Sequence, residues 1–232
     1  MDKKIFVLHK IRNIALALQH LFFPFRCPIC YKPATYGCKR CIASSIMPVP
    51  IFCVNCGLPH TEESNCKNYI PLFALSSYSD GIRKFIIKLK FHNYRPLGKL
   101  FGRFLAHRFC ERIENLSPDY LTFIPNHKNS ARTFSHTEDI AIGLGEKMGI
   151  PVSDCLEWKF SIAHQIGKTG AEREELASDS LQVTDEANIA GKKFILIDDV
   201  YTTGSTARAG IQALKNAGAA CVAIIVVAKQ IS

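Results

Sequence analysis

Hydrophobic positions along this chain alternate between short apolar runs and longer segments in which apolar side chains recur at helical spacing. A short apolar run bounded by turn residues is typical of a buried strand, whereas repeats at three and four residues indicate an amphipathic helix. The runs predict strands at 68–79, 120–125, 194–197 and 221–228, with another strand opening at 150–152. The helical spacing predicts helices at 81–94, at 96–113, from the end of a polar loop (126–136) to 148, and at about 205–217, whereas 160–185 follows neither pattern.

This order of elements predicts an α/β fold. Strands that alternate with helices form mostly parallel, doubly wound sheets, because each crossover helix must pack back onto the sheet. The segment from residue 194 to residue 228 has the order strand, helix, strand, which makes a complete unit of this kind. We therefore expect a mostly parallel sheet with helices on both faces.

Two adjacent carboxylates follow the most apolar of these strands. Phe194-Ile195-Leu196-Ile197 leads directly into Asp198 and Asp199. Two neighbouring carboxylates inside a sheet would carry a severe desolvation cost, so we expect the strand to end before them. The carboxyl ends of strands in open α/β sheets face the crevice where ligands bind. Asp198 and Asp199 are therefore the candidate catalytic pair.

The loop after the carboxylates has the composition of an anion-binding turn. Amide groups at a helix N-terminus attract anions, hydroxyl side chains add donors, and Gly204 lets the backbone approach closely. The nucleotide-binding P-loop pattern with its lysine does not occur here, so a monophosphate is the expected anion. A sugar phosphate would place its phosphate on this loop and its diol on the carboxylates; the alternative is an ordinary capped turn. The predicted substrate-binding residues of the loop are Thr202, Thr203, Gly204, Ser205 and Thr206.

Cysteine spacing predicts structural zinc in the first third of the chain. Cysteine pairs two residues apart in a reducing compartment are typical of zinc sites rather than disulfides. The first predicted set has four thiolates and the second has three, with His60 as the chosen fourth ligand and an empty site as the alternative. The sets are Cys27, Cys30, Cys38 and Cys41, and then Cys53, Cys56 and Cys66.

The first half of the chain is basic and the second half is mildly acidic. Residues 1–116 contain 18 lysines and arginines against 6 acidic residues, whereas residues 117–232 contain 11 against 14. The apolar stretch at 14–25 is too short to span a bilayer and lacks a cleavage pattern, so we expect a helix at 5–23 and a cytoplasmic protein. A helix at the membrane surface is the alternative. The predicted domains are an N-terminal helix (1–24), a zinc-ribbon module (25–70) and the α/β domain (71–232).

The motif Ile-Leu-Ile-Asp-Asp-Val-Tyr-Thr-Thr-Gly-Ser-Thr resembles the phosphoribosyl pyrophosphate motif of type I phosphoribosyltransferases. Together with the cysteine pairs and the Leu-Lys-Phe-His segment at 89–92, it resembles the ComF family of competence proteins. The resemblance runs from about residue 20 to the end of the chain. Two further family segments correspond to 124–127 and 132–136, and a family asparagine is replaced by Leu176.

The resemblance implies binding of phosphoribosyl pyrophosphate with Mg²⁺, with Lys128 and Arg132 as candidate charges near the pyrophosphate. The alternative for both is an ordinary solvated charge on the loop. It implies either a phosphoribosyltransferase of unidentified acceptor, or a nucleotide- or single-stranded-DNA-binding accessory factor without turnover. It also implies a context of DNA uptake and natural transformation, with other competence proteins as partners. The basic residues before position 116 would then bind single strands weakly, with an affinity that falls steeply with salt. Nothing in the sequence predicts the oligomeric state.

Overall fold

A computed structural model describes residues 26–33, 38–60, 66–91, 94–126, 134–159, 180–184 and 188–231. The predicted helix at 5–23 lies outside these residues. So do most of the polar loop, which includes Lys128 and Arg132, and most of 160–185. Within the described ranges, no helix is long and apolar enough to span a membrane.

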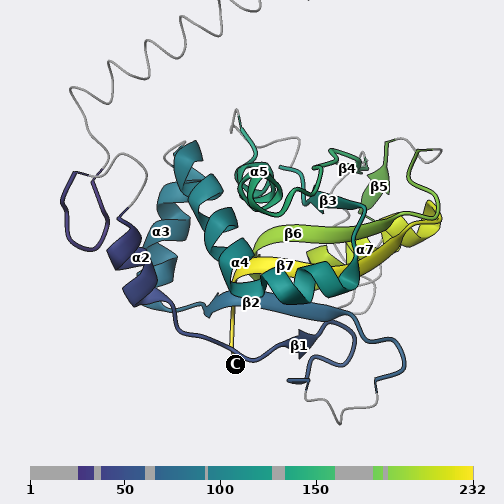
Figure 1. The fold of residues 1–232 in the computed structure, drawn as a ribbon, viewed down its shortest axis with the longest axis horizontal. Helices are drawn as coiled ribbons and strands as arrows, with labels where there is room; N and C mark the ends of the chain where they lie inside the picture. The colour runs from purple at the N-terminus through teal and green to yellow at the C-terminus, as the bar shows by residue number, and fades with distance from the viewer. Residues whose placement is uncertain are drawn as a thin grey trace, which may run out of the picture.

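A five-stranded sheet in the order β1-β2-β7-β6-β3 forms the centre of the molecule (Figure 1). The neighbours from β2 to β3 all run parallel, and only the edge strand β1 is antiparallel, so the predicted mostly parallel α/β sheet is confirmed. A separate antiparallel pair consists of β4 and β5. The strands are β1 (Phe52–Cys53), β2 (Pro71–Ser77), β3 (Tyr120–Phe123), β4 (Leu156–Trp158), β5 (Leu181–Val183), β6 (Lys193–Tyr201) and β7 (Ala220–Lys229).

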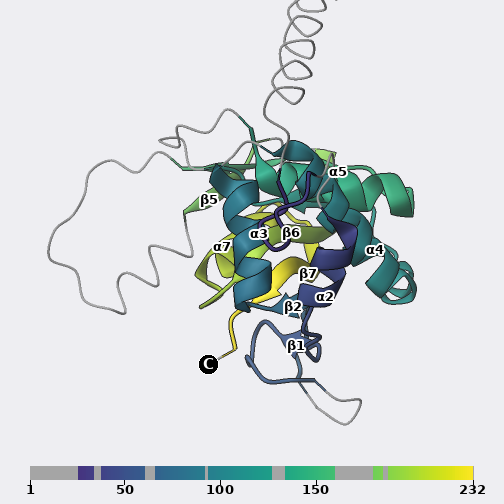
Figure 2. The same ribbon diagram turned by 90° about the vertical axis from the view of Figure 1, so that its left-hand side faces the viewer.

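Helices cover both faces of the sheet. The helices are α2 (Lys39–Ser45), α3 (Asp80–Phe91), α4 (Arg95–Leu116), α5 (His136–Met148) and α7 (Ser205–Asn216). One core joins α2, α3, α4 and α5 to alternate strand residues such as Ile195 and Ile197, and a second core joins α7 to Phe194 and Leu196. Figure 2 shows α7 on one side of the strands and α4 and α5 on the other. The sheet is therefore doubly wound, as predicted.

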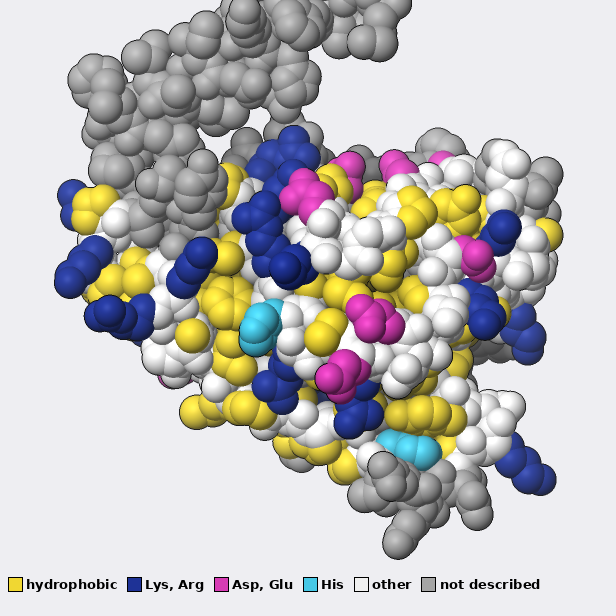
Figure 3. Space-filling model, viewed as in Figure 1, with side chains coloured by type: hydrophobic (Ala, Val, Ile, Leu, Met, Phe, Trp, Pro, Cys, Tyr) yellow, Lys and Arg dark blue, Asp and Glu magenta, His cyan; other side chains and the backbone are white. Residues whose placement is uncertain are grey.

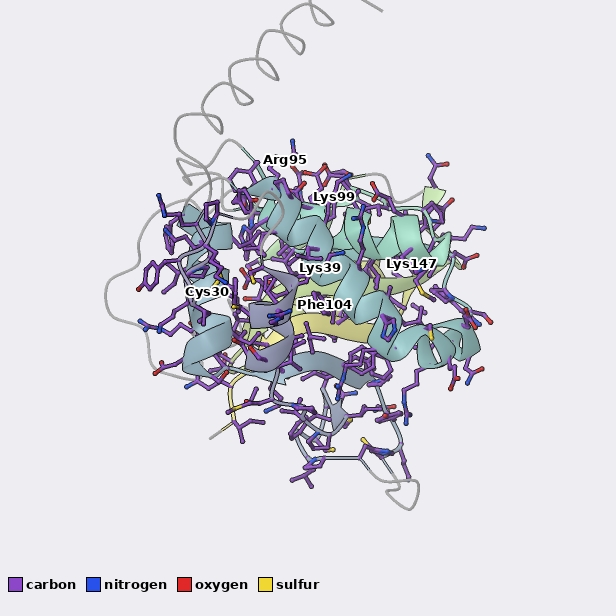
Figure 4. The ribbon with its side chains drawn as sticks, turned by 60° about the vertical axis from the view of Figure 1, so that its left-hand side comes forward. Cys30, Lys39, Arg95, Lys99, Phe104 and Lys147 are labelled. Carbon is purple, nitrogen blue, oxygen red and sulfur yellow. The ribbon has the colours of Figure 1, made fainter. Side chains whose placement is uncertain are left out.

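A close crossing of α4 and α5 fixes the position of α5 over the sheet. A Cβ atom on Gly102 would collide with the backbone of Ile140, so only glycine permits this approach. The guanidinium of Arg95 also donates hydrogen bonds to the fully buried Asp139, with Nη2 and Oδ1 2.9 Å apart. Figure 4 shows Arg95 and Lys99 extending from α4 on the side of α5. The N-terminus of α5 is therefore held rigidly where it meets β6.

Two strand predictions need correction. The segment at 150–152 forms only a single parallel bridge, between Val152 and Leu121, because the chain turns away after Ser153 donates to the Leu121 carbonyl. The strand predicted at 194–197 runs from Lys193 to Tyr201 and includes both carboxylates. The predicted strands at 68–79, 120–125 and 221–228 correspond to β2, β3 and β7, and the predicted helices correspond to α3, α4, α5 and α7. The hydrophobic pattern did not predict α2, β1, β4 or β5.

Candidate functional site

Asp198 and Asp199 lie within β6, at the point where the sheet loses a strand on one side. On one side, β6 stays paired with β7 as far as Tyr201, which lies opposite Lys229. On the other side, β3 ends at Phe123, which lies opposite Ile197. The expectation that the strand ends before the acids is wrong, because pairing with β7 continues. The carboxylates nevertheless line a cavity, and among the described residues no strand pairs with this edge of β6 beyond Ile197.

Asp199 is buried and is held by two cationic or ionisable side chains. Lys90, in the last turn of α3, lies 2.8 Å from Oδ2 of Asp199, and Nε2 of His136, at the start of α5, lies 2.5 Å from the same oxygen. Burial alone would raise the pKa of this carboxyl, but the hydrogen bond with His136 and the charge of Lys90 outweigh it and lower the pKa. Asp199 is therefore a carboxylate with its partners already in place.

The surroundings of Asp198 favour its protonated form, in contrast to those of Asp199. Its Oδ1 accepts a hydrogen bond from the Asp199 amide at 2.7 Å. Burial, followed by the negative charge of Asp199, raises the pKa of Asp198 to about 8. Neighbouring carboxylates whose pKa values differ are frequent at functional sites, because catalytic acids and bases need pKa values suited to their roles.

The loop after β6 turns at a glycine and leads directly into α7. Gly204 has a φ of +79° and caps α7, whose helical residues begin at Ser205. A Cβ atom at Gly204 would also collide with the hydroxyl group of Tyr201. Thr203 and Ser205 share a hydroxyl contact of 3.2 Å, and Arg208 donates to the Thr203 carbonyl at 3.0 Å. The amides at the start of α7 therefore face an open, hydroxyl-rich turn.

A cavity of about 640 Å³ joins the carboxylates to this loop. Of the predicted substrate-binding residues, Thr202 and Thr206 line it together with Asp198 and Asp199, whereas Thr203, Gly204 and Ser205 do not. Lys128 and Arg132 lie outside the described residues, so their placement near a pyrophosphate stays a prediction. The cavity is about the size of a small-molecule site.

Three side chains of this cavity were not singled out as site residues from the sequence. Lys90 occurs within the Leu-Lys-Phe-His segment, His136 is the last residue of the polar loop (126–136), and Trp158 lies just before the unpatterned segment at 160–185. Trp158 donates from Nε1 to the Pro125 carbonyl at 2.8 Å, so its ring forms part of the cavity wall beside Pro125. The sequence signal that could have suggested a role for Lys90 is the Leu-Lys-Phe-His segment at 89–92, which is part of the family resemblance.

The first cysteine set forms a compact group. The sulfur atoms of Cys27, Cys30, Cys38 and Cys41 all lie within 4.8 Å of one another. Thiolates bound tetrahedrally at about 2.3 Å from zinc are about 3.8 Å apart, so the four residues fit a structural Zn²⁺ ion. Cys27 and Cys41 also belong to the core formed with α3 and α4. A metal at this position would connect the start of α2 to the preceding turn.

The second set lacks the predicted fourth ligand among the described residues. The sulfur atoms of Cys53, Cys56 and Cys66 lie within 4.8 Å of one another, with Cys53 and Cys66 3.5 Å apart. His60 is not part of this group, because its ring stacks on Tyr69 with the ring centroids 3.8 Å apart. The three thiolates are suited to zinc, but the choice of His60 is not supported by this arrangement.

Comparison with known proteins points to one domain type. Residues 145–232 match the family described as the phosphoribosyl transferase domain. The transcriptional regulator GfcR of Methanocella arvoryzae is 28% identical over 94 residues, which cover 38% of this chain and 45% of that protein. The chain therefore spans less than half the length of that curated relative.

Solved structures of similar backbone include an adenine phosphoribosyltransferase, at 18% identity over 60% of this chain and 72% of that chain, with a TM-score of 0.40. A purine phosphoribosyltransferase from Pyrococcus horikoshii is 17% identical over 53% of this chain and 79% of that chain, with a TM-score of 0.32. Residues 145–232, which match the family described as the phosphoribosyl transferase domain, include both carboxylates and the loop after them.

Proposed function

We propose that the chain binds phosphoribosyl pyrophosphate in the cavity beside β6 and transfers its phosphoribosyl group to an acceptor. The observation that carries the proposal is that Asp198, Asp199, Thr202 and Thr206 line one cavity. This places carboxylates, which accept hydrogen bonds from a sugar diol, next to the amide- and hydroxyl-rich start of α7, which suits a phosphate.

In the proposed reaction, the bond between C1 of the ribose and the pyrophosphate oxygen breaks, and the electron pair leaves with pyrophosphate. An acceptor atom then forms its bond to C1 and loses its proton. Asp198 and Asp199 would orient the ribose through its hydroxyls and stabilise the positive charge that develops on the ring. Lys90 and His136 would keep Asp199 charged and correctly oriented.

Mg²⁺, bound with the pyrophosphate, would neutralise part of the phosphate charge, and the carboxylate oxygens beside the cavity are ligands that suit a hard cation. Lys128 and Arg132 are proposed to add positive charge near the leaving group.

Pyrophosphate release tests the proposal directly. The protein is incubated with phosphoribosyl pyrophosphate and Mg²⁺, alone and with a panel of bases and amines, and the released pyrophosphate is measured. We expect release that depends on an acceptor and is lost in Asp198→Asn/Asp199→Asn. If phosphoribosyl pyrophosphate binds but no acceptor causes release of pyrophosphate, the protein binds this ligand without transferring its phosphoribosyl group.

A second candidate function is ligand sensing without turnover. It is favoured by the similarity to GfcR over 94 residues, because that relative is named a transcriptional regulator rather than a transferase. In this case the same cavity would bind phosphoribosyl pyrophosphate or a nucleotide, and occupancy would alter contacts with a partner. The proposed contexts of DNA uptake, single-stranded DNA and competence proteins rest on the family resemblance and are compatible with either function.

A further inference from the structure

A second cavity, of about 710 Å³, lies between α4 and the segments that flank β1. Its walls come from residues 49–51, from His60 and Tyr69, and from one face of α4. It shares no lining residue with the cavity beside β6. We name it the α4 groove.

Two arginines give the α4 groove a concentrated positive charge. Arg108 and Arg112 are four residues apart on α4, so they project from the same face of the helix, and both line the groove. In the described part of the chain neither forms an ion pair, whereas Lys99 and Arg103 of the same helix both pair with Glu146. Figure 3 shows Lys and Arg side chains beside hydrophobic ones on the lower part of this face. The two guanidinium groups are therefore available to a ligand.

Planar rings also line the α4 groove. The ring of Tyr69 stacks on His60 at an interplanar angle of 27°, and Tyr69 is 39% exposed. Phe109, between the two arginines in sequence, also lines the groove. In addition, the buried Nε2 atom of His60 has no hydrogen-bond partner within the described residues, which leaves one polar atom of the wall unsatisfied. The groove therefore combines a cationic wall with an aromatic one.

We propose that the α4 groove is a binding site for a nucleoside monophosphate. A phosphomonoester carries nearly two negative charges near neutral pH, which match two guanidinium groups, whereas each diester of a strand carries one. Arginine is suited to phosphate because its planar fork donates two parallel hydrogen bonds. The base would stack on the exposed face of Tyr69, as bases do on aromatic side chains. The proposal is independent of the function proposed for the cavity beside β6.

Calorimetric titration with adenosine monophosphate tests the proposal in a variant whose cavity beside β6 is designed not to bind phosphate. Ser205→Asp places a negative charge at the start of α7, where it repels phosphate while the helix dipole tolerates it. Trp158, the chain's single tryptophan, lines the first cavity, so its fluorescence reports on that site separately. We expect Ser205→Asp to bind the nucleotide without a change in tryptophan fluorescence.

The groove residues are then replaced in the same background. Arg108→Ala/Arg112→Ala should weaken binding at least about tenfold, since charge-assisted hydrogen bonds are lost. Tyr69→Ala should weaken nucleotide binding about fivefold or more and leave inorganic phosphate binding unchanged. The matched control is Lys84→Ala/Lys88→Ala, which removes two charges at the same spacing from α3 and should change nothing.

Equal weakening by the lysine control would overturn the proposal, because binding would then follow overall charge. Loss of all binding in Ser205→Asp alone would also overturn it, because the nucleotide would then occupy only the first cavity. Tighter binding of a short oligothymidylate than of the monophosphate, lost in the arginine variant, would reassign the groove to a nucleic-acid strand.

Discussion

Asp198 and Asp199 are adjacent in sequence but have opposite roles in the stability of the ligand-free protein. Asp199 is held by Lys90 and His136, so it stabilises the fold through a salt bridge with Lys90 and a short hydrogen bond with His136. Asp198 faces the cavity and has a raised pKa, so its charged form is disfavoured until a ligand supplies a partner. A site in which Asp199 already has partners, while Asp198 is charged only once a ligand donates to it, is consistent with the binding of a sugar diol.

Single substitutions should separate these two roles. Asp199→Asn should lower the free energy of unfolding by about 1.5–3 kcal/mol, which corresponds to a Tm lower by about 3–12 °C. Asp198→Asn should melt at the same temperature as the wild-type protein or higher, because it removes a carboxylate that is costly to charge. Thermal melts of both variants without ligand provide the measurement. A lower Tm for Asp198→Asn than for Asp199→Asn would contradict these roles.

The pH dependence of stability gives an independent check on Asp198. A carboxyl whose pKa is higher in the folded than in the unfolded protein binds its proton more tightly when folded, so stability is lost as pH rises from about 4 towards the folded value. The folded pKa of Asp198 is about 8. The Tm advantage of Asp198→Asn over the wild-type protein should therefore grow between about pH 5 and about pH 8. A difference that stays constant across this interval would argue against a raised pKa.

At the scale of elements, the turn from β6 into α7 determines whether the anion cradle can form. Gly204→Ala introduces a side chain at a positive φ and against the Tyr201 hydroxyl group, so it should destabilise the protein by about 1–2 kcal/mol and weaken phosphate binding. Gly204→Ala/Tyr201→Phe removes the hydroxyl but leaves the ring carbon Cζ within collision distance, so it should recover only a small part of the stability. Chemical denaturation of both variants measures the effect, and equal stability of Gly204→Ala and the wild-type protein would contradict it.

Elements were predictable from sequence where local pattern decides them, as in α3, α4 and β7, whose apolar positions repeat without interruption. The continuation of β6 through two carboxylates was not predictable, because it depends on β7 running on after β3 has ended. The approach of Lys90 and His136 to Asp199 was also hidden, since three distant segments meet only in the folded chain. The strand, the glycine turn and the helix start within the motif were predictable because all three depend on local sequence.

At the scale of the whole molecule, the cysteine-rich segment is built into the α/β domain. Cys27 and Cys41 pack in the same core as Phe73 and Phe85, and β1, which contains Cys53, pairs with β2. The boundary proposed at residue 70 therefore divides segments that share buried side chains. Loss of zinc should consequently weaken the α/β domain as well as the cysteine turns.

Freshly purified protein should contain at least one tightly bound zinc ion per chain, and chelation should lower the Tm and the helical signal of the whole domain. His60→Ala should keep the same zinc content as the wild-type protein, because His60 is not grouped with the three thiolates. Cys41→Ser is the matched variant that should lose a zinc ion. Metal analysis of the three proteins is the test. An absence of zinc from fresh protein, or a loss of zinc in His60→Ala, would contradict these assignments.

Titration calorimetry with phosphoribosyl pyrophosphate and Mg²⁺ tests the central claim most directly. Asp198→Asn/Asp199→Asn keeps the shape of both side chains but removes the charge that strengthens their hydrogen bonds to a ribose diol. We expect saturable binding to the wild-type protein, with affinity at least about tenfold lower in the double variant, measured at a temperature where circular dichroism shows it folded. Unchanged affinity in the folded double variant would contradict the assignment of Asp198 and Asp199 to the ribose site.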